Sequence, residues 1–197
     1  NYRWGGADAP AGKSPYFDET ASRMLTTMRL SMLEVAQEAL YQGDRLRKEN
    51  NPSAAAKEYG KAVKVLDLLS EKLPDRTMAY SLSAATTRAQ LYCELGLKDR
   101  LNNQKLVQKG LGMYRTLIER YAQYVVYNQR MAAQFINPSL TIESQLIPYQ
   151  FYSLVEGYGK YGGKLGDVEK KLRAMGINLE VMKKNYEQYT SQGASAA

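Results

Sequence analysis

Apolar residues recur at alternating steps of four and three along most of this chain, the spacing that keeps one stripe of an α-helix facing a partner. No segment alternates apolar and polar residues as a half-buried strand does. The pattern therefore predicts an all-α fold of helices packed side by side. The expected stripes are Met24, Met28, Met32, Val35, Ala36, Ala39 and Leu40; Ala55, Tyr59, Ala62, Leu66, Leu69 and Leu73; and Met78, Leu82, Ala85, Ala89 and Tyr92.

Cap and breaker residues predict where the helices begin and end. Asp18 suits the N-cap of the first helix, and Gly43 suits its end. Asn51-Pro52 offers an N-cap and first helical residue for the second helix, which Pro74 ends. The further helices are expected from about Thr77 to Gly96, from about Asp99 to Ile136, from Asn137 to Gly162, over 167–175 and over 178–189, with Pro148 either kinking the fifth or marking its start.

These boundaries predict four segments: an irregular lead-in over 1–17, helical hairpins over 18–136, a C-terminal helical cap over 137–190 and a disordered tail over 191–197. The helix pair around residues 36–62 resembles a tetratricopeptide repeat through Ala55-x3-Tyr59-x2-Ala62, and Tyr92-x3-Gly96 resembles the start of a second unit. This resemblance implies an α-α superhelix with a concave binding face.

Composition narrows the kinds of partner. The 197 residues suit one domain, or one domain with a terminal extension, and tyrosine is abundant, with 16 Tyr against 3 Phe and 1 Trp. The net charge of +7 comes from scattered basic residues, so we expect no nucleic-acid partner and instead a solvated basic surface or one near anionic lipid. No run approaches the 18 apolar residues of a membrane span.

The residues needed for most catalytic centres are missing. The chain has no histidine and one cysteine, which excludes Ser–His and Cys–His nucleophiles, histidine-ligated metals and zinc–thiolate sites. We therefore expect no metal, no cofactor and no catalytic residue. Residues 157–162 match G-x-G-x-x-G, but helical spacing precedes them where a dinucleotide site needs a strand. Cys93 is expected to be a small buried hydrophobe, the alternative being a reactive thiol.

Three tyrosines follow one another at steps of three, at Tyr121, Tyr124 and Tyr127. We expect a tyrosine-lined helix interface with Tyr121 and Tyr124 facing inward. The alternative is a sugar- or peptide-binding face, since aromatic planes with hydroxyl edges suit such ligands.

Three residues near the N-terminus are further candidates for binding. Trp4, in the lead-in, either fastens that segment onto the core or stacks on a ligand. Arg23 and Arg29 lie on the first helix, where they are either solvated or fix the lead-in or an anionic group.

Several short segments of the N-terminal half resemble those of a known family: Trp4-Gly5-Gly6-Ala7-Asp8, Tyr16-Phe17-Asp18-Glu19, Arg23-Met24, Arg29, Val65-Leu66-Asp67 and Leu73-Pro74. Through these segments the chain, to about residue 125, is similar to the bacterial protein O-mannosyltransferase-like family of membrane glycosyltransferases. Members of this family have a membrane-spanning transferase part followed by a helical C-terminal region, which this chain resembles. Residues 44–56 resemble an insertion where the family has a short turn. The family's catalytic acidic loop lies in the membrane part, and no residue here matches it.

The resemblance implies a non-catalytic accessory domain on the extracytoplasmic (periplasmic) side of the bacterial inner membrane, tethered by an N-terminal membrane region of its own parent chain. Its expected partners are a protein or glycan acceptor and that membrane part. The chain opens on Asn1, and we expect it to be a piece of a longer protein. The alternative is a freestanding cell-envelope scaffold that binds peptides in its concave groove.

Overall fold

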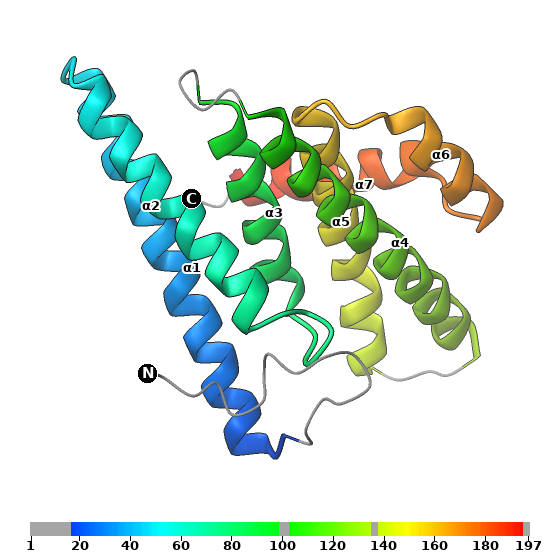
Figure 1. Ribbon diagram of the computed structural model, residues 1–197. Helices are drawn as coiled ribbons and strands as arrows, with labels where there is room; N and C mark the ends of the chain where they lie inside the picture. Colours follow the sequence, from blue (N-terminus) through cyan, green and yellow to red (C-terminus); the bar gives the residue numbers. More distant parts are fainter. Residues whose placement is uncertain (1–16, 99–102, 135–137, 195–197) are drawn as a thin grey trace. The chain divides into compact units, whose positions relative to one another are not determined.

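The computed structural model describes residues 17–98, 103–134 and 138–194, and this part of the chain contains helices and no strand, which confirms the all-α prediction (Figure 1). None of the described helices has both the length and the apolar character needed to cross a bilayer. The helices are α1 (Glu19–Lys48), α2 (Pro52–Lys72), α3 (Leu82–Gly96), α4 (Gln104–Gln134), α5 (Pro138–Lys160), α6 (Leu165–Ala174) and α7 (Leu179–Ala194).

The chain divides into two compact units, one up to Gly110 (unit 1) and one from Leu111 on (unit 2). This division falls inside α4, whereas the cap residues placed the boundary between hairpins and C-terminal cap at 136/137. A helix continues across a boundary between packed units because its backbone hydrogen bonds are local and do not depend on which neighbour covers it.

In unit 1, α1 and α2 form an antiparallel hairpin (Figure 1). The predicted α2 stripe from Ala55 to Leu73 is confirmed, since all six of its residues are at most 3% exposed. The caps of α2 are also as predicted: the Asn51 side chain accepts a hydrogen bond from the Ala54 amide, Pro52 is the first helical residue, and the helix gives way at Leu73.

The predicted stripe of α1 is confirmed in part. Ala36, Ala39 and Leu40 are buried as predicted, but Met24 and Val35 are 63% and 56% exposed, and the buried stripe is completed by Arg29, Leu33 and Gly43. The observed stripe is rotated by about 60° from the expected one. The methionines shifted the prediction, because they were read as core residues although they lie on a flank of the helix.

Gly43 does not end α1, and this prediction is also wrong. A Cβ placed on Gly43 would lie 2.6 Å from Cδ1 of Tyr59 and closer still to Cε1, so this glycine lets α1 and α2 approach each other. The helix instead ends at Lys48, and Asn50 takes a left-handed conformation with φ 56° that allows the Asn51 amide to bond back to the Leu46 carbonyl.

α3 lies against both helices of the hairpin and is buried on several sides, including at Ala84, Ala89, Leu91 and Leu95. It begins at Leu82 rather than near Thr77, because Ser81 is its N-cap and accepts from the Ala84 amide. Cys93 is fully buried, as predicted, and the first turns of α4 press on it. A Cβ on Gly110 would lie 2.5 Å from the Cys93 sulfur.

Unit 2 contains the rest of α4 together with α5, α6 and α7. Pro148 lies inside α5 and does not mark its start, while Gly162 closes the helix region as predicted, with φ +86°. α6 ends at Ala174, and the following Gly176, with φ +83°, lets the Ile177 amide bond to the Leu172 carbonyl at 2.9 Å and turns Ile177 into the core. The expected tail over 191–197 lies in α7 up to Ala194; the remaining residues are outside the described part.

Candidate functional site

The two arginines predicted for binding have different surroundings, and Trp4 lies outside the described residues. Arg23 is exposed and pairs with Glu19 one turn earlier at 2.5 Å, as a solvated arginine does. Arg29 is only 3% exposed, so the expectation that it is solvated is wrong.

Arg29 fastens the connector between α2 and α3. Its Nη2 donates to the carbonyls of Leu73 (3.1 Å) and Pro74 (2.9 Å), and its Nη1 donates to that of Ala79 (3.4 Å). The guanidinium carbon lies 3.9 Å from the ring centroid of Tyr80, whose hydroxyl donates to the Leu73 carbonyl at 2.8 Å. Burial lowers the pKa of Arg29, and the nearby Tyr80 and Asp75 oppose that effect. Arg29 therefore holds unit 1 together, and both of its terminal nitrogens are already used.

The tyrosines of α4 do not line one interface. Tyr121 is half-buried, but Tyr124 and Tyr127 are 43% and 56% exposed, so the inward placement of Tyr124 is wrong. A step of three residues falls short of a full turn by about 60°, so successive tyrosines move away from the buried face. The ring of Tyr121 meets that of Tyr124 edge-on at 6.1 Å. The rings of Tyr124 and Tyr127 are therefore exposed to solvent on unit 2, as the alternative of a sugar- or peptide-binding face requires.

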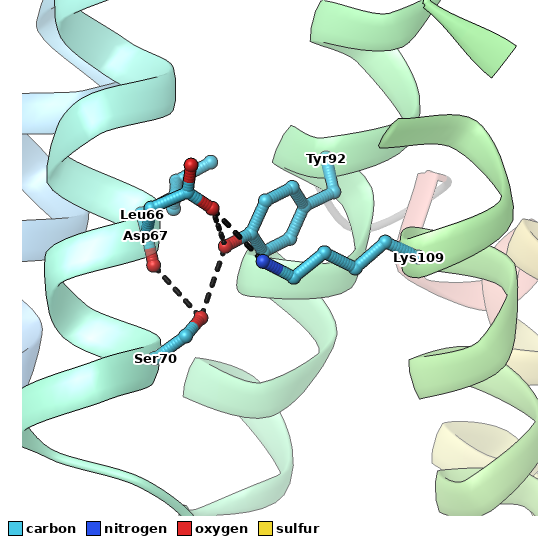
Figure 2. Close-up of polar contacts among 5 residues, drawn as sticks. All are labelled: Leu66, Asp67, Ser70, Tyr92 and Lys109. Carbon is cyan, nitrogen blue, oxygen red and sulfur yellow. Dashed lines mark hydrogen bonds and ion pairs between the residues drawn. The ribbon is translucent and has the colours of Figure 1, made fainter. Parts of the chain in front are cut away.

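A polar cluster joins three helices in the middle of unit 1 (Figure 2). The Tyr92 hydroxyl on α3 lies 3.0 Å from Asp67 and 2.9 Å from the Ser70 hydroxyl, both on α2. Lys109 of α4 donates to the same Asp67 oxygen at 2.9 Å and lies 4.3 Å from the Tyr92 ring centroid. Ser70 also donates to the Leu66 carbonyl of its own helix at 2.8 Å.

Serine, tyrosine and lysine within hydrogen-bonding range could in principle transfer protons, but a catalytic tyrosine needs an accessible hydroxyl and a lowered pKa. Tyr92 is fully buried, and burial raises its pKa. Because no substrate reaches the Tyr92 hydroxyl, the cluster fastens α2, α3 and α4 together.

A second cluster joins α1, α2 and the residues after α3. The Tyr59 hydroxyl donates to Asp44 at 2.6 Å, and Lys98 donates to both Asp44 oxygens at 2.7 and 2.8 Å. Burial and the Asp44 carboxylate raise the pKa of Tyr59 to about 12. Burial would raise the pKa of Asp44, but the hydrogen bonds from Lys98 and Tyr59 outweigh it and lower that pKa. This cluster also belongs to the interior framework.

Unit 2 contains a groove between α4 and α6 that sequence reasoning missed. Its volume is about 350 Å³, and its floor is apolar, with Ile118 and Ala122 from α4 and Val168 and Leu172 from α6. Charged side chains form its rim, where Lys171 donates to Glu119 at 2.6 Å and lowers the pKa of that carboxyl. The i, i+4 pair Val168 and Leu172 is visible in the sequence, but nothing there shows that α4 covers it.

Ala174 and Met175 lie at one end of this groove, and both reach solvent. The groove falls within the range of volumes typical of ligand pockets, with a mainly apolar lining and few polar groups. It is therefore a candidate binding site in the described part of unit 2.

Two further features carry no site. Gly157 and Gly159, of the G-x-G-x-x-G match, lie inside α5, so the strand and loop of a dinucleotide site are missing there. Within the described ranges, no three His, Cys, Asp or Glu side chains cluster as metal ligands would. Comparison of the chain with protein-family models, curated proteins and solved structures finds no match.

Proposed function

We propose that this chain is a non-catalytic binding module, the extracytoplasmic accessory domain of a membrane-embedded protein glycosyltransferase, and that it holds the acceptor protein beside the membrane part of its parent chain. The observation that carries the binding role is the groove between α4 and α6. The link to a glycosyltransferase is supported by the sequence similarity of residues 4–74 described above.

The lining of the groove suits a polypeptide segment. Its floor offers apolar contact to one or two buried side chains, while Arg115 and Lys171 on the rim are balanced by Glu119 and Asp167. A rim of mixed charge does not select a strongly anionic or cationic ligand, but it can form hydrogen bonds with an exposed peptide backbone. A protein acceptor with an apolar residue between polar ones therefore fits this groove.

Filling the groove tests the proposal. Ala174→Phe places an aromatic ring at the exposed end of the groove without altering its buried floor. In the full-length parent protein we expect this substitution to lower transfer to the acceptor at least five-fold while the melting temperature of the domain is unchanged. Undiminished transfer would overturn the proposed role of the groove.

Lys170→Phe is the matched control, because Lys170 is exposed on the same helix but does not line the groove. It adds the same ring to α6, so a loss of transfer in both variants would indicate a general effect of an exposed aromatic residue. Trp4→Ala and Arg23→Ala test the two other N-terminal candidates in the same assay. Arg29→Ala does not, because it would remove the buried contacts of unit 1.

The alternative, a freestanding envelope scaffold that binds peptides, depends on the same groove. The gene sequence upstream of Asn1 separates the two: hydrophobic spans in the same reading frame favour the accessory domain, whereas a signal peptide directly upstream favours the scaffold.

A further inference from the structure

α3 covers one side of the α1–α2 hairpin (Figure 1). Ser70 marks this side of α2, because its hydroxyl lies 2.9 Å from the Tyr92 hydroxyl on α3. Asp44 marks this side of α1, because it accepts a hydrogen bond from Lys98, which follows α3. An α-helix turns by about 100° per residue, so a residue nine positions from either marker projects from the opposite side of the hairpin.

The side of the hairpin opposite α3 carries three lysines of α2. Lys61 lies nine residues before Ser70, and Lys57 and Lys64 lie one turn before and after Lys61 on the same stripe. All three lysines are exposed. Glu58 pairs with Lys61 at 2.6 Å, but Lys57 and Lys64 pair with no carboxylate among the described residues. Two ammonium groups are therefore available to a partner.

The same side also exposes apolar side chains. Val35 lies nine residues before Asp44 and is 56% exposed, and Leu68 continues the lysine stripe of α2 and is 40% exposed. The two helices are antiparallel, and Gly43 lies against Tyr59. Val35 is about 12 Å from that contact along α1 and Leu68 about 14 Å along α2, in the same direction, so the two side chains lie at one level.

We call this side the outer face of the hairpin. Its residues are Lys57, Lys61, Lys64 and Leu68 from α2, and Met24 and Val35 from α1.

We propose that the outer face docks on an anionic phospholipid bilayer, with the lysine ammonium groups among the headgroups and the apolar side chains at the interface. Lysine stems are long enough to lie along an apolar surface while the ammonium groups reach the headgroups. A surface for nucleic acid combines cations with aromatic rings, and the outer face has no aromatic side chain. The outer face belongs to unit 1, so its test does not depend on the groove in unit 2.

Vesicle binding tests the proposal. The chain is mixed with phosphatidylcholine vesicles that contain about 30% phosphatidylglycerol, and the bound fraction is measured by sedimentation. We expect binding that weakens steeply as sodium chloride is raised from about 0.05 to about 0.5 M, and no comparable binding to pure phosphatidylcholine. The double variant Lys57→Gln/Lys64→Gln should lower the partition coefficient about 25-fold, since each lysine near an anionic surface contributes about five-fold.

Lys170→Gln/Lys184→Gln is the matched control. Both lysines are exposed on helices of unit 2, and their replacement lowers the net charge by two, from +7 to +5, as the outer-face double variant does. We expect this control to lower the partition coefficient by less than about three-fold, because these charges do not lie on the docking face. An equal loss in both double variants would show that net charge drives binding and would overturn the proposal.

The apolar contribution is measured at constant charge. Val35→Gln/Leu68→Gln should lower the partition coefficient at least about three-fold. Val181→Gln is the control, because Val181 is 52% exposed on α7, and it should leave the partition coefficient unchanged. Circular dichroism verifies that each variant is folded.

Several other results would overturn the proposal. One is a lack of binding to the anionic vesicles at the lower salt concentration, and another is a partition coefficient that Val35→Gln/Leu68→Gln does not change. Tighter binding to duplex DNA or to polyglutamate through the same lysines would make the partner a soluble polyanion. A dimer in analytical ultracentrifugation that Val35→Gln/Leu68→Gln converts to monomers would make the outer face an interface between two copies of the chain.

Discussion

Replacing Gly43 by alanine tests the close approach of α1 and α2. In most helix interiors this change stabilises a protein by about 1 kcal/mol, since alanine has the higher helix propensity. At Gly43 the new methyl group would lie 2.6 Å from Cδ1 of Tyr59. Ring and methyl group cannot both keep their places.

Moving the Tyr59 ring aside would disrupt its contacts. It is 3% exposed, and its hydroxyl is bonded to Asp44, which Lys98 holds through both carboxylate oxygens. Overpacking of this kind costs about 1–3 kcal/mol, and loss of the hydrogen bond to the Asp44 carboxylate adds about 1.5–3 kcal/mol if the ring is displaced. After subtracting the propensity gain of about 1 kcal/mol, we expect Gly43→Ala to lower the free energy of unfolding by up to about 2 kcal/mol if the ring keeps its hydrogen bond, and by about 1.5–5 kcal/mol if the ring is displaced.

Gly60→Ala is the matched control, because Gly60 lies in α2 of the same hairpin and a Cβ there meets no atom within 4 Å. We expect this variant to raise the free energy of unfolding by about 0.5–1 kcal/mol. Urea denaturation followed by circular dichroism measures both changes. If Gly43→Ala stabilises the chain as much as Gly60→Ala does, the two helices do not pack as described and the reasoning fails. In a Tyr59→Leu background the cost of Gly43→Ala should largely disappear.

Three further predictions concern buried polar and ionisable groups. Because burial raises the pKa of Cys93 to about 12, the folded chain should not react with a thiol reagent at pH 8, and reaction should appear only with unfolding; rapid labelling of the native chain would contradict this. The pKa of Tyr59 is raised from 10.0 to about 12 on folding, so the unfolded chain loses this proton first and stability should fall as pH rises from 10 to 12. Tyr59→Phe should show a smaller fall over that interval in denaturant titrations. Tyr92→Phe should lower the free energy of unfolding by about 1–2 kcal/mol, because it removes a hydroxyl bonded to Asp67 and Ser70, and a loss equal to that of the exposed Tyr127→Phe would refute the role of the cluster.

How well the sequence predicted each helix depended on how many neighbours that helix has. α2 presents one face to the core, so a single stripe identifies its buried residues, and all six were correct. α1 has two apolar flanks, one buried and one that includes Met24 and Val35, and a pattern of apolar residues alone does not tell them apart. α3 is covered on several sides, so residues outside its predicted apolar stripe are also buried.

The candidate sites were harder to predict, because they join residues far apart in the sequence. Lys171 donates a hydrogen bond to Glu119, which lies 52 residues earlier in the sequence, and no local sequence pattern predicts such a pair. Arg29 looked like a surface arginine because most arginines are exposed. Its burial depends on carbonyls of the α2–α3 connector, which are left without helical partners at the end of α2 and therefore accept from its guanidinium.

The tyrosines of the described helices have two kinds of surroundings, buried and exposed. In unit 1, Tyr59, Tyr80 and Tyr92 are at most 7% exposed, each hydroxyl is hydrogen-bonded, and each ring carries a cation within 5.6 Å of its centroid. In unit 2, Tyr114, Tyr158 and Tyr161 are also buried, whereas the rings of Tyr124 and Tyr127 are exposed, as is that of Tyr41 in unit 1. A buried ring that contacts a cation and whose hydroxyl is hydrogen-bonded cannot contact a partner protein. An exposed ring can. Recognition of an acceptor is therefore better sought on unit 2, around the groove and the two open tyrosines, while substitutions at the interior tyrosines of unit 1 should act on stability.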